Sequence, residues 1–473
     1  MSLVVIAAAF LLPVRADLLK PIIPMEEGSV LVYPERALAG AIPNRDFETM
    51  YGPANVWLLA GVYRVAGQGV MVERIVGLLY RLALVLGLFF IARRYGVAAG
   101  IAAGLLATLL LAGTWAVAYA WFGGLALATW SLFFASDERR LFLAGLLGGL
   151  ALAFRPDLAI AIGAIVILVR RRRFIVGVLI GSIPIWILLA LAGATSVFTG
   201  LVVDPIVRDR SGARFPIPWT SPLLWLVLGS TVVLTAAGLV LKGREGDRGL
   251  FMCALFSIGL LPQAFQRPDD WHTASAGCVA VAMLPVASMV FAPQGQRTIA
   301  VTLAGLVALP LTWGSALPGM MESIGQTFGG GVRASYPVTF EGRTVPLPAQ
   351  EQTQWLSGLM TEITRDTKPG DRIFVGPRNT SRTVYNDTFL YYLLPHLIPA
   401  SYFLEMNAGI ADSATSRLAD DVASADVVVL TTRYDDWAAA AAAATHHWGP
   451  PVLDPSEFCL RSTYGPWELF LKC

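Results

Sequence analysis

Apolar stretches fill most of the first 315 residues of this chain and constrain its fold more than any other feature. Most of them are close to the roughly 20 residues that an α-helix needs to cross the apolar core of a bilayer. The chain is 55% hydrophobic and 14% charged, whereas a soluble domain carries roughly 25% charged residues. We therefore predict an α-helical polytopic membrane protein with about 11 membrane segments. The segments lie at about residues 2–14, 69–92, 96–113, 117–135, 141–154, 157–169, 174–194, 221–241, 249–265, 274–292 and 297–315.

Basic residues gather in the short loops that share one side of the membrane if the N-terminus is cytoplasmic. Loops on the cytoplasmic side of a membrane are enriched in Lys and Arg. We therefore predict a multi-pass protein of the cytoplasmic (plasma) membrane with an extracytoplasmic C-terminal part. The net charge of +2 gives no indication of a nucleic-acid partner. The basic loops contain Arg93-Arg94, residues 137–140, residues 170–173, residues 242–244 and Arg297.

Two segments are too short to cross a bilayer separately. Residues 141–154 and 157–169 lie between two basic clusters, with Arg155-Pro156-Asp157 at the midpoint. Because proline breaks a helix, we predict a short hairpin of two half-length helices. An Arg–Asp pair at membrane depth must face protein or a wet cavity. It is either a salt bridge that holds the hairpin tip or part of a functional site.

The composition changes after residue 315, where Pro, Gly and charged residues return. We predict a transmembrane domain over residues 1–315, with a first outer loop at 15–68, and a small extracytoplasmic α/β domain over residues 316–473. The C-terminal domain contains β-like runs at 372–375, 427–430 and 467–471 and helical patterns at 349–366 and 412–424.

Cysteines and asparagines of the C-terminal domain suggest two modifications. Cys459 and Cys473 flank a turn as the arms of a hairpin would, and the outer compartment is oxidising, so we predict a disulfide between them. Cys253 and Cys278 lie in membrane segments and are expected to be small core residues. The segments that begin at Asn379 and Asn386 fit the short glycan acceptor pattern, which also occurs often by chance.

Charged residues cluster in the first outer loop. Glu26, Glu27, Arg45, Asp46 and Glu48 follow the first apolar segment closely. A carboxylate that is desolvated beside lipid is costly, so such a cluster is a hypothesis for a functional site. The alternative is that these are ordinary loop acids in water.

Three further residues lie on the same predicted side: Arg155, Arg267 and His272. An arginine fork matches phosphate oxygens bidentately, and a carboxylate takes a proton from an attacking hydroxyl. His272 either donates to a phosphate or is an interfacial histidine that bonds Asp269. The sequence contains no Asp-x-Asp motif and no Gly-rich phosphate loop, which argues against a soluble nucleotide-sugar donor.

We assign no cofactor and no metal ligand. His446-His447 has no third ligand at a recognisable spacing and is interpreted as a solvated helix end. The adjacent Glu26 and Glu27 are possible ligands of a hard divalent cation. Such an ion usually takes more oxygen ligands than the sequence places there.

Several motifs carry a resemblance to a known family. In this order they resemble motifs of the GT-C-type membrane glycosyltransferases that use polyprenyl-phosphate sugars, a group that includes protein mannosyltransferases and lipid A aminoarabinose transferase. The similarity covers the chain to about residue 315, and it departs from the family at Glu26, where the catalytic residue is usually Asp. The motifs are Glu26-Glu27-Gly28, Gly40 to Phe47, Gly52-Pro53, Gly148 to Arg155 and Arg267 to His272.

The resemblance implies an inverting glycosyltransferase. It would move a sugar from a polyprenyl-monophosphate donor to a cell-envelope acceptor, which is a glycan, lipid or protein on the outer face of the cytoplasmic membrane. The resemblance makes Glu26 the base, with Glu27 and Asp46 supporting it. The donor phosphate would be bound by Arg155, Arg267, His272 and Arg45. A polymerase or ligase of lipid-linked glycans, and a non-catalytic transporter or assembly protein, remain as alternatives.

Overall fold

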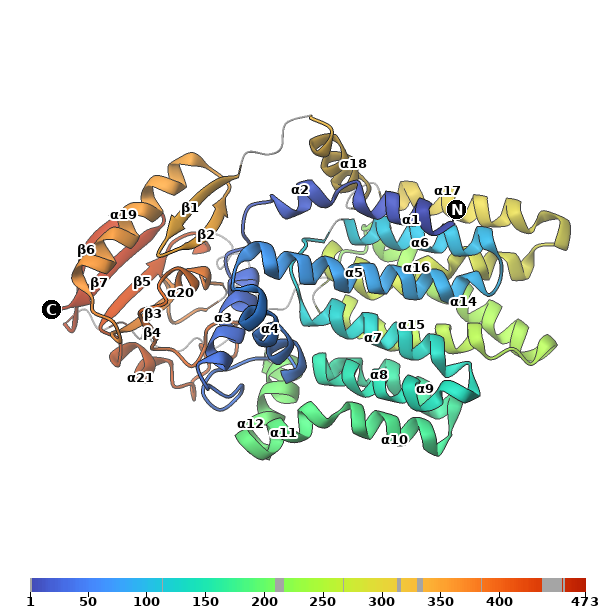
Figure 1. Ribbon diagram of the computed structural model, residues 1–473, viewed down its shortest axis with the longest axis horizontal. Coiled ribbons are helices and arrows are strands. Elements are labelled where there is room, and N and C mark those ends of the chain that lie inside the picture. Colours follow the sequence, from blue (N-terminus) through green and yellow to red (C-terminus); the bar gives the residue numbers. More distant parts are fainter. Residues whose placement is uncertain are drawn as a thin grey trace. The chain divides into compact units, whose positions relative to one another are not determined.

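The computed structural model of the chain describes residues 2–112, 114–208, 217–266, 268–312, 316–329, 335–383, 385–435, 453 and 456–473. Contacts divide the chain into two compact units (Figure 1). The helical unit comprises Met1–Leu18, Arg74–Ile185 and Pro216–Val332. The mixed unit comprises Leu19–Glu73, Trp186–Phe215 and Arg333–Cys473.

Two segments that were expected in the transmembrane domain belong to the mixed unit, and residues 186–215 are one of them. The first outer loop, which the sequence assigned to the transmembrane domain, clusters with the C-terminal segment in the mixed unit. Apolar residues of both segments share one core, among them Leu31 and Val56 from the loop and Phe389 from the C-terminal segment. The division into one domain before residue 315 and a second domain after it stays a prediction.

The helical unit contains the apolar helices. Every predicted apolar stretch is helical over most of its described length. Its elements are α1 (Ser2–Leu11), α2 (Val14–Leu18), α5 (Val70–Arg93, whose first residues belong to the mixed unit), α6 (Val97–Ala112), α7 (Ala120–Ala135), η1 (Glu138–Arg140), α8 (Leu141–Phe154), η2 (Pro156–Leu158), α9 (Ala159–Val169), α10 (Arg172–Gly181), α11 (Ile183–Ala192, which extends into the mixed unit), α14 (Pro222–Glu245), α15 (Gly249–Gln266), α16 (Asp270–Phe291), η4 (Gln294–Gln296), α17 (Arg297–Leu311) and α18 (Ala316–Thr327).

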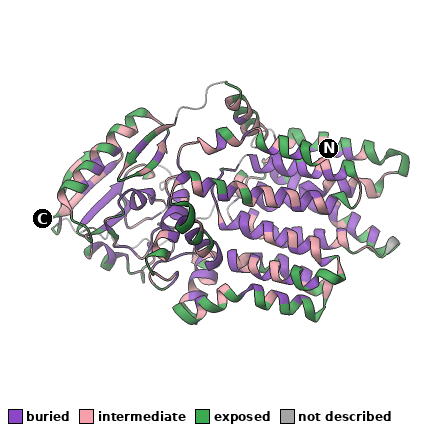
Figure 2. Cartoon of the chain, in the orientation of Figure 1, coloured by how far each residue is buried: buried purple, intermediate pink, exposed green. Residues whose placement is uncertain are grey.

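Four of the described helices are long and apolar enough to cross a membrane: α5, α14, α15 and α16. The number rises to six if α10 with α11, and residues 294–311 with α18, are each counted as one bent span. Figure 2 shows exposed residues along the helices of this unit. They include large apolar residues such as Val232, which is 68% exposed. The protein is therefore a multi-pass membrane protein, and the number of 11 segments stays a prediction.

Small residues hold the helices of this unit close together. Gly145 and Gly149 of α8 face Gly177 and Gly181 of α10, and an added Cβ at any of the four would stand within 2.4 Å of the facing backbone. Glycine at these positions lets two backbones approach. The pairing 145 with 177 and 149 with 181 makes α8 and α10 parallel, so the intervening α9 runs in the opposite direction. This agrees with the predicted hairpin.

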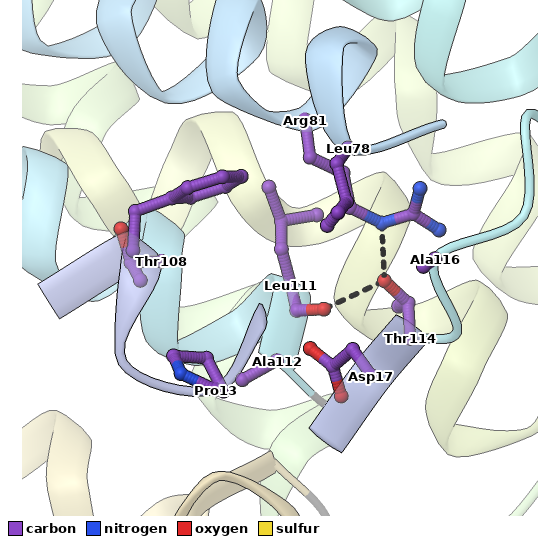
Figure 3. Close-up of a pocket in the computed structure, with 10 residues that line it drawn as sticks. Pro13, Asp17, Leu78, Arg81, Thr108, Leu111, Ala112, Thr114 and Ala116 are labelled. Atoms are coloured by element: carbon purple, nitrogen blue, oxygen red, sulfur yellow. Dashed lines mark hydrogen bonds between the residues drawn. The ribbon is translucent and has the colours of Figure 1, made fainter. Parts of the chain in front are cut away.

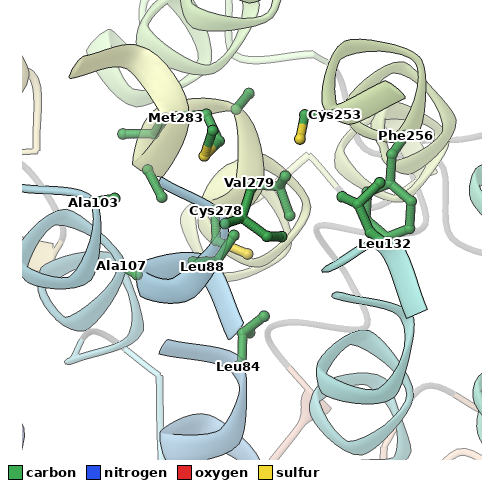
Figure 4. Close-up of a cluster of buried hydrophobic side chains, with 14 of the residues drawn as sticks. Leu84, Leu88, Ala103, Ala107, Leu132, Cys253, Phe256, Cys278, Val279 and Met283 are labelled. Carbon is green, nitrogen blue, oxygen red and sulfur yellow. The ribbon is translucent and has the colours of Figure 1, made fainter. Parts of the chain in front are cut away.

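The centre of the helical unit is apolar (Figure 4). Leu84 and Leu88 of α5 pack near Ala103 and Ala107 of α6 and the side chains of α16. Cys253 and Cys278 are buried free thiols in this core, as the sequence predicted.

The mixed unit is built on a five-stranded sheet of order β4-β3-β5-β7-β6. β3 is parallel to β4 and β5, whereas β7 is antiparallel to β5 and β6. Strands β1 and β2 form a separate hairpin. The elements are α3 (Glu26–Leu38), α4 (Pro53–Ala66), α12 (Ala194–Phe198), the π-helix η3 (Thr199–Arg208), β1 (Tyr336–Phe340), β2 (Arg343–Leu347), α19 (Gln350–Asp366), β3 (Arg372–Pro377), α20 (Phe389–Leu393), β4 (Ile398–Pro399), α21 (Leu418–Ala423), β5 (Val427–Thr431), β6 (Phe458–Tyr464) and β7 (Trp467–Lys472).

Successive side chains of a strand point to opposite faces, so the sheet is buried on both sides. Val427 and Val429 share a core with α19, and Val428 and Leu430 share a second core with α21. The three predicted strands and the disulfide between Cys459 and Cys473 are confirmed.

Candidate active site

The first turn of α3 carries both glutamates of the first-loop motif. Acidic side chains at this position complement the positive end of the helix dipole. Glu27 is fully buried, and its Oε2 accepts a hydrogen bond of 3.0 Å from the backbone N–H of Ile23. Glu26 is half-buried. The two carboxylates therefore differ, because Glu27 fixes the chain entering α3 and Glu26 is the more accessible.

Gly28 completes this motif by allowing a close approach between two distant parts of the chain. A Cβ at Gly28 would stand 2.4 Å from the backbone nitrogen of Phe389. The Phe389 N–H also donates to the carbonyl of Pro24 at 3.1 Å. The start of α3 is thereby held against the turn that leads into α20.

That turn contributes a buried carboxylate, Asp387. It accepts hydrogen bonds from the Tyr434 hydroxyl at 3.2 Å and the Trp467 indole N–H at 2.6 Å. The Nε of Arg433 lies 3.3 Å from the same carboxylate. A charge that is wholly removed from water is tolerated when it is paired and hydrogen-bonded in this way.

Tyr434 connects this buried carboxylate to Glu26. Burial raises the pKa of Tyr434 well above its ordinary value, and Asp387 and Glu26 raise it further through their negative charge, while Arg433 lowers it. Glu26, Asp387, Arg433 and Tyr434 therefore form one polar cluster, which we call the Glu26 cluster. The buried Nη2 of Arg433 has no hydrogen-bond partner among the described residues.

Arg45 and Asp46 lie elsewhere on the mixed unit. Asp46 accepts two hydrogen bonds from Arg45, at 3.0 and 2.8 Å, and one of 2.7 Å from the Ile42 N–H. These contacts, led by the Arg45 hydrogen bond, hold the pKa of Asp46 below its ordinary value. Asp46 also interacts electrostatically with Arg36. Arg36 is about 15 Å along α3 from Glu26, at 1.5 Å per residue, so the structure does not bring Asp46 to the Glu26 cluster.

The turn around Arg45 is held by the C-terminal segment. Asn44 has a positive φ of 59°, and its carbonyl accepts a hydrogen bond of 3.1 Å from the Tyr402 hydroxyl. The Glu48 N–H donates to the Tyr402 carbonyl at 2.7 Å. These contacts give the motif from Gly40 to Phe47 a structural role, because they hold its turn against the C-terminal segment.

Two further buried carboxylates, Glu48 and Glu405, lie near Tyr33. Phe47 stacks on Tyr33 with a centroid distance of 5.2 Å. Burial raises the pKa of Tyr33, and the charges of Glu405 and Glu48 raise it further. Asn407 donates to Glu405 at 3.1 Å. Glu48 belongs to the charged cluster that the sequence indicates in the first outer loop, whereas Glu405 has no such signal, because its position near Tyr33 joins segments far apart in the chain.

In the helical unit, Arg155 and Asp157 form a bidentate pair at the tip of the hairpin. The two contacts measure 3.0 and 2.6 Å, and the Arg155 side chain is 14% exposed. The guanidinium lies 5.6 Å from the ring centroid of Trp121 on α7. The salt bridge that the sequence offered as one interpretation is therefore present.

His272 lies in the first turn of α16. Asp269 caps this helix by accepting the His272 N–H at 2.7 Å, and its other oxygen lies 2.7 Å from His272 Nδ1. The Trp271 ring contacts His272, Tyr119 and Phe122 with centroid distances of 4.6, 5.2 and 5.6 Å.

Arg155 and His272 are linked through the start of α7. Trp121 contacts Arg155, and the neighbouring Phe122 contacts Trp271 beside His272. Both residues therefore lie at the same end of the helical unit. The third predicted phosphate ligand of this unit, Arg267, lies outside the described residues.

Arg81 fixes the segment that precedes α7 (Figure 3). Its guanidinium donates to Thr114 at 3.1 Å, to Val117 at 3.0 Å and to the carbonyl of Trp115, and it lies 4.1 Å from the Phe122 ring centroid. The adjoining cavity, lined by Asp17 among others, has a volume of about 20 Å³. This is the size of a water site and is too small for a sugar.

Comparison with solved structures decides the fold. The crystal structure of ArnT from Cupriavidus metallidurans bound to undecaprenyl phosphate aligns with a TM-score of 0.57 at 14% identity, over 99% of this chain and 97% of ArnT. The apo structure of the same protein aligns with a TM-score of 0.55 at 13% identity over the same shares. This chain has the fold of ArnT.

The resemblance seen in the sequence is thereby confirmed at the level of the fold. No protein-family model matches the chain, and no curated protein matches it significantly. Within the described part of the chain, no group of three or more His, Cys, Asp or Glu side chains is arranged to hold a metal ion. His446 and His447 lie outside that part.

Proposed function

We propose that this protein is an inverting membrane glycosyltransferase that moves a sugar from a polyprenyl monophosphate to an acceptor in the cell envelope. The observation that carries this proposal is the likeness, over nearly the full length of both chains, to an ArnT structure that holds undecaprenyl phosphate. The acceptor is a glycan, lipid or protein at the outer face of the cytoplasmic membrane. The proposal includes 11 membrane segments, a cytoplasmic N-terminus, and domains over residues 1–315 and 316–473.

Glu26 is the proposed base. Its carboxylate takes the proton from the acceptor hydroxyl, and the hydroxyl oxygen attacks the anomeric carbon from the side opposite the phosphate. The bond from the anomeric carbon to the phosphate oxygen breaks, and the lipid phosphate leaves with the electron pair. General-base catalysis of this kind contributes roughly 10²–10⁴-fold. Glu26 is more accessible than Glu27, which is buried and accepts a hydrogen bond from the Ile23 N–H. This difference supports Glu26 as the base.

Glu27 and Asp46 receive supporting roles of different kinds. Glu27 positions the first turn of α3 and, with it, the Glu26 carboxylate. Asp46 stabilises the turn that contains Arg45 and acts at a distance from the base.

The donor phosphate is assigned to arginine and histidine. Arg155 contacts Trp121, and Trp271 beside His272 contacts the neighbouring Phe122, which supports the two residues acting on one phosphate. Arg267 is retained from the sequence motif. Arg45 is retained with a smaller contribution, because its guanidinium already holds Asp46. Positioned cations of this kind stabilise the charge that develops on a leaving phosphate.

The test is a transfer assay with purified full-length protein in lipid vesicles. Undecaprenyl monophosphate carrying a series of labelled sugars is supplied with cell-envelope extract as acceptor, and undecaprenyl pyrophosphate sugars and nucleotide sugars are supplied in parallel. We expect label transfer and release of undecaprenyl phosphate from a monophosphate donor only. Transfer from the pyrophosphate donors alone would identify a polymerase or ligase and contradict the proposal.

A further inference from the structure

The helical unit contains a second polar cavity at the end opposite the tip of the α8–α9 hairpin. It lies where α7 leads into α8, α9 leads into α10, and α14 leads into α15. Its volume is about 320 Å³, which falls at the lower end of the range of ligand pockets. No residue of the proposed transfer site lines it.

The acidic residues of this cavity are already engaged. Asp247 accepts a hydrogen bond of 2.7 Å from the Gly249 N–H and one of 3.1 Å from the Tyr95 hydroxyl. Glu138 pairs with Arg171 at 3.2 Å, and both side chains of this pair are well exposed. An exposed ion pair contributes little to stability. Arg171 can therefore leave Glu138 and bind a phosphate group at a small cost in free energy.

The cavity wall carries two arginines and two carboxylates, and only one of the arginines is paired with a carboxylate within the described part of the chain. Arg248 lines the cavity, and its guanidinium has no partner among the described residues. Arg171 belongs to a run of four consecutive arginines at residues 170–173. An arginine fork binds two oxygens of one phosphate, so the cavity presents two such groups to an anion.

The rest of the wall is apolar. Leu141, Leu168, Val169 and Met252 line the cavity beside the two arginines. These residues lie at the ends of apolar helices, which the predicted topology places at the cytoplasmic boundary between lipid and water. A soluble anion makes no favourable contact with apolar side chains. A phospholipid, in contrast, places its headgroup against the cations and its first acyl carbons against the apolar residues.

We propose that this cavity binds the phosphate headgroup of an anionic phospholipid. Arg171 and Arg248 hold the phosphate, and Leu168 and Met252 contact the glycerol end of the acyl chains. Basic pockets between transmembrane helices are suited to this class of ligand. The inference does not depend on the transfer activity.

The test measures lipid that stays bound to full-length protein. Protein reconstituted with equal amounts of phosphatidylglycerol and phosphatidylcholine is extracted in mild detergent, and the retained lipids are measured by mass spectrometry. We expect selective retention of phosphatidylglycerol, reduced about tenfold or more in the double variant R171Q/R248Q because two charge-assisted contacts are lost. The variant R171K/R248K, which keeps the charge, is expected to retain an intermediate amount.

The matched control is R172Q/R173Q, which removes the same charge at exposed positions that follow Arg171 directly and lie outside the cavity. We expect this control to retain phosphatidylglycerol as the unmodified protein does. An equal loss in both double variants would mean a diffuse charge effect and would overturn the proposal. Displacement of phosphatidylglycerol by millimolar inorganic phosphate would identify a site for soluble anions and would also overturn it.

Discussion

Gly28 of α3 lies so close to Phe389 at the start of α20 that a Cβ on the glycine would stand 2.4 Å from the Phe389 backbone nitrogen. This contact joins two segments more than 350 residues apart in the sequence and brings Asp387 and Tyr434 near Glu26. The position of the proposed base thus depends on the C-terminal segment as well as on the first outer loop.

The first prediction concerns Gly28. We expect Gly28→Ala to destabilise the protein by about 1–3 kcal/mol, because the facing backbone cannot move aside as a side chain would. Thermal unfolding of the full-length protein in detergent measures the change. The matched control is Gly61→Ala, a helical glycine with nothing within 4 Å of the added Cβ. Equal effects of the two substitutions would show that the contact with Phe389 is not a close one.

The second prediction concerns pH. Glu362 of α19 accepts hydrogen bonds from Ser462, from Tyr464 at 2.9 Å and from Arg365 at 2.9 Å. These contacts, led by that of Ser462, lower the pKa of Glu362 below its ordinary 4.5. A lowered pKa means that the folded state favours the charged form, so the stabilisation is present above pH 4.5 and is lost as the pH falls through the lowered value.

We therefore expect Glu362→Gln to lower the melting temperature at neutral pH and to have a diminishing effect as the pH falls below about 4. Glu351→Gln, at an exposed position of the same helix, is the control and should have little effect at either pH. A loss of stability that stays constant between neutral and acidic pH would refute the role of the carboxylate charge.

The third prediction concerns Arg155. We expect Arg155→Ala to raise the apparent KM for the lipid donor or to lower turnover by about 10–100-fold, because one charge-assisted contact to phosphate is lost. Lysine should rescue only in part, because it has no planar fork. The comparison variant is Asp157→Ala, which removes only the partner in the salt bridge. If both variants unfold the protein alike, the pair is structural and Arg155 has no separate role in donor binding.

The fourth prediction concerns sidedness. Cys253 and Cys278 are replaced by Ala, and the disulfide between Cys459 and Cys473 is kept. A new cysteine at Val65, which is 90% exposed, should react with an impermeant maleimide added outside intact cells. One at Arg244 should react only after the cells are permeabilised. The reverse pattern would invert the topology that the basic loops predict.

The elements of this fold were predictable from the sequence because their signals are local. Apolar stretches predicted the helices, and short β-like runs predicted strands β3, β5 and β7. The disulfide followed from two cysteines that flank one turn. The number of membrane spans was harder to predict, because a helix shorter than the bilayer has no length signal of its own.

The surroundings of Glu26 were not predictable, because they depend on contacts between distant segments. Asp387 lies in a segment that fits the glycan acceptor pattern, but Asn386 is buried and donates to the carbonyls of Val375 and Leu404. In the folded protein this asparagine is therefore inaccessible to a glycan. Tyr434, which connects Asp387 to Glu26, has no motif in the sequence at all.

The most direct test of the central claim is the transfer rate of Glu26→Gln in vesicles. This substitution keeps the size of the side chain and removes the base, so we expect transfer to fall by roughly 10²–10⁴-fold with unchanged folding. Glu27→Gln and Asp46→Asn are measured beside it, and we expect both to keep more activity. Full activity of Glu26→Gln, or a loss confined to one of the other two variants, would contradict the assignment of Glu26 as the base.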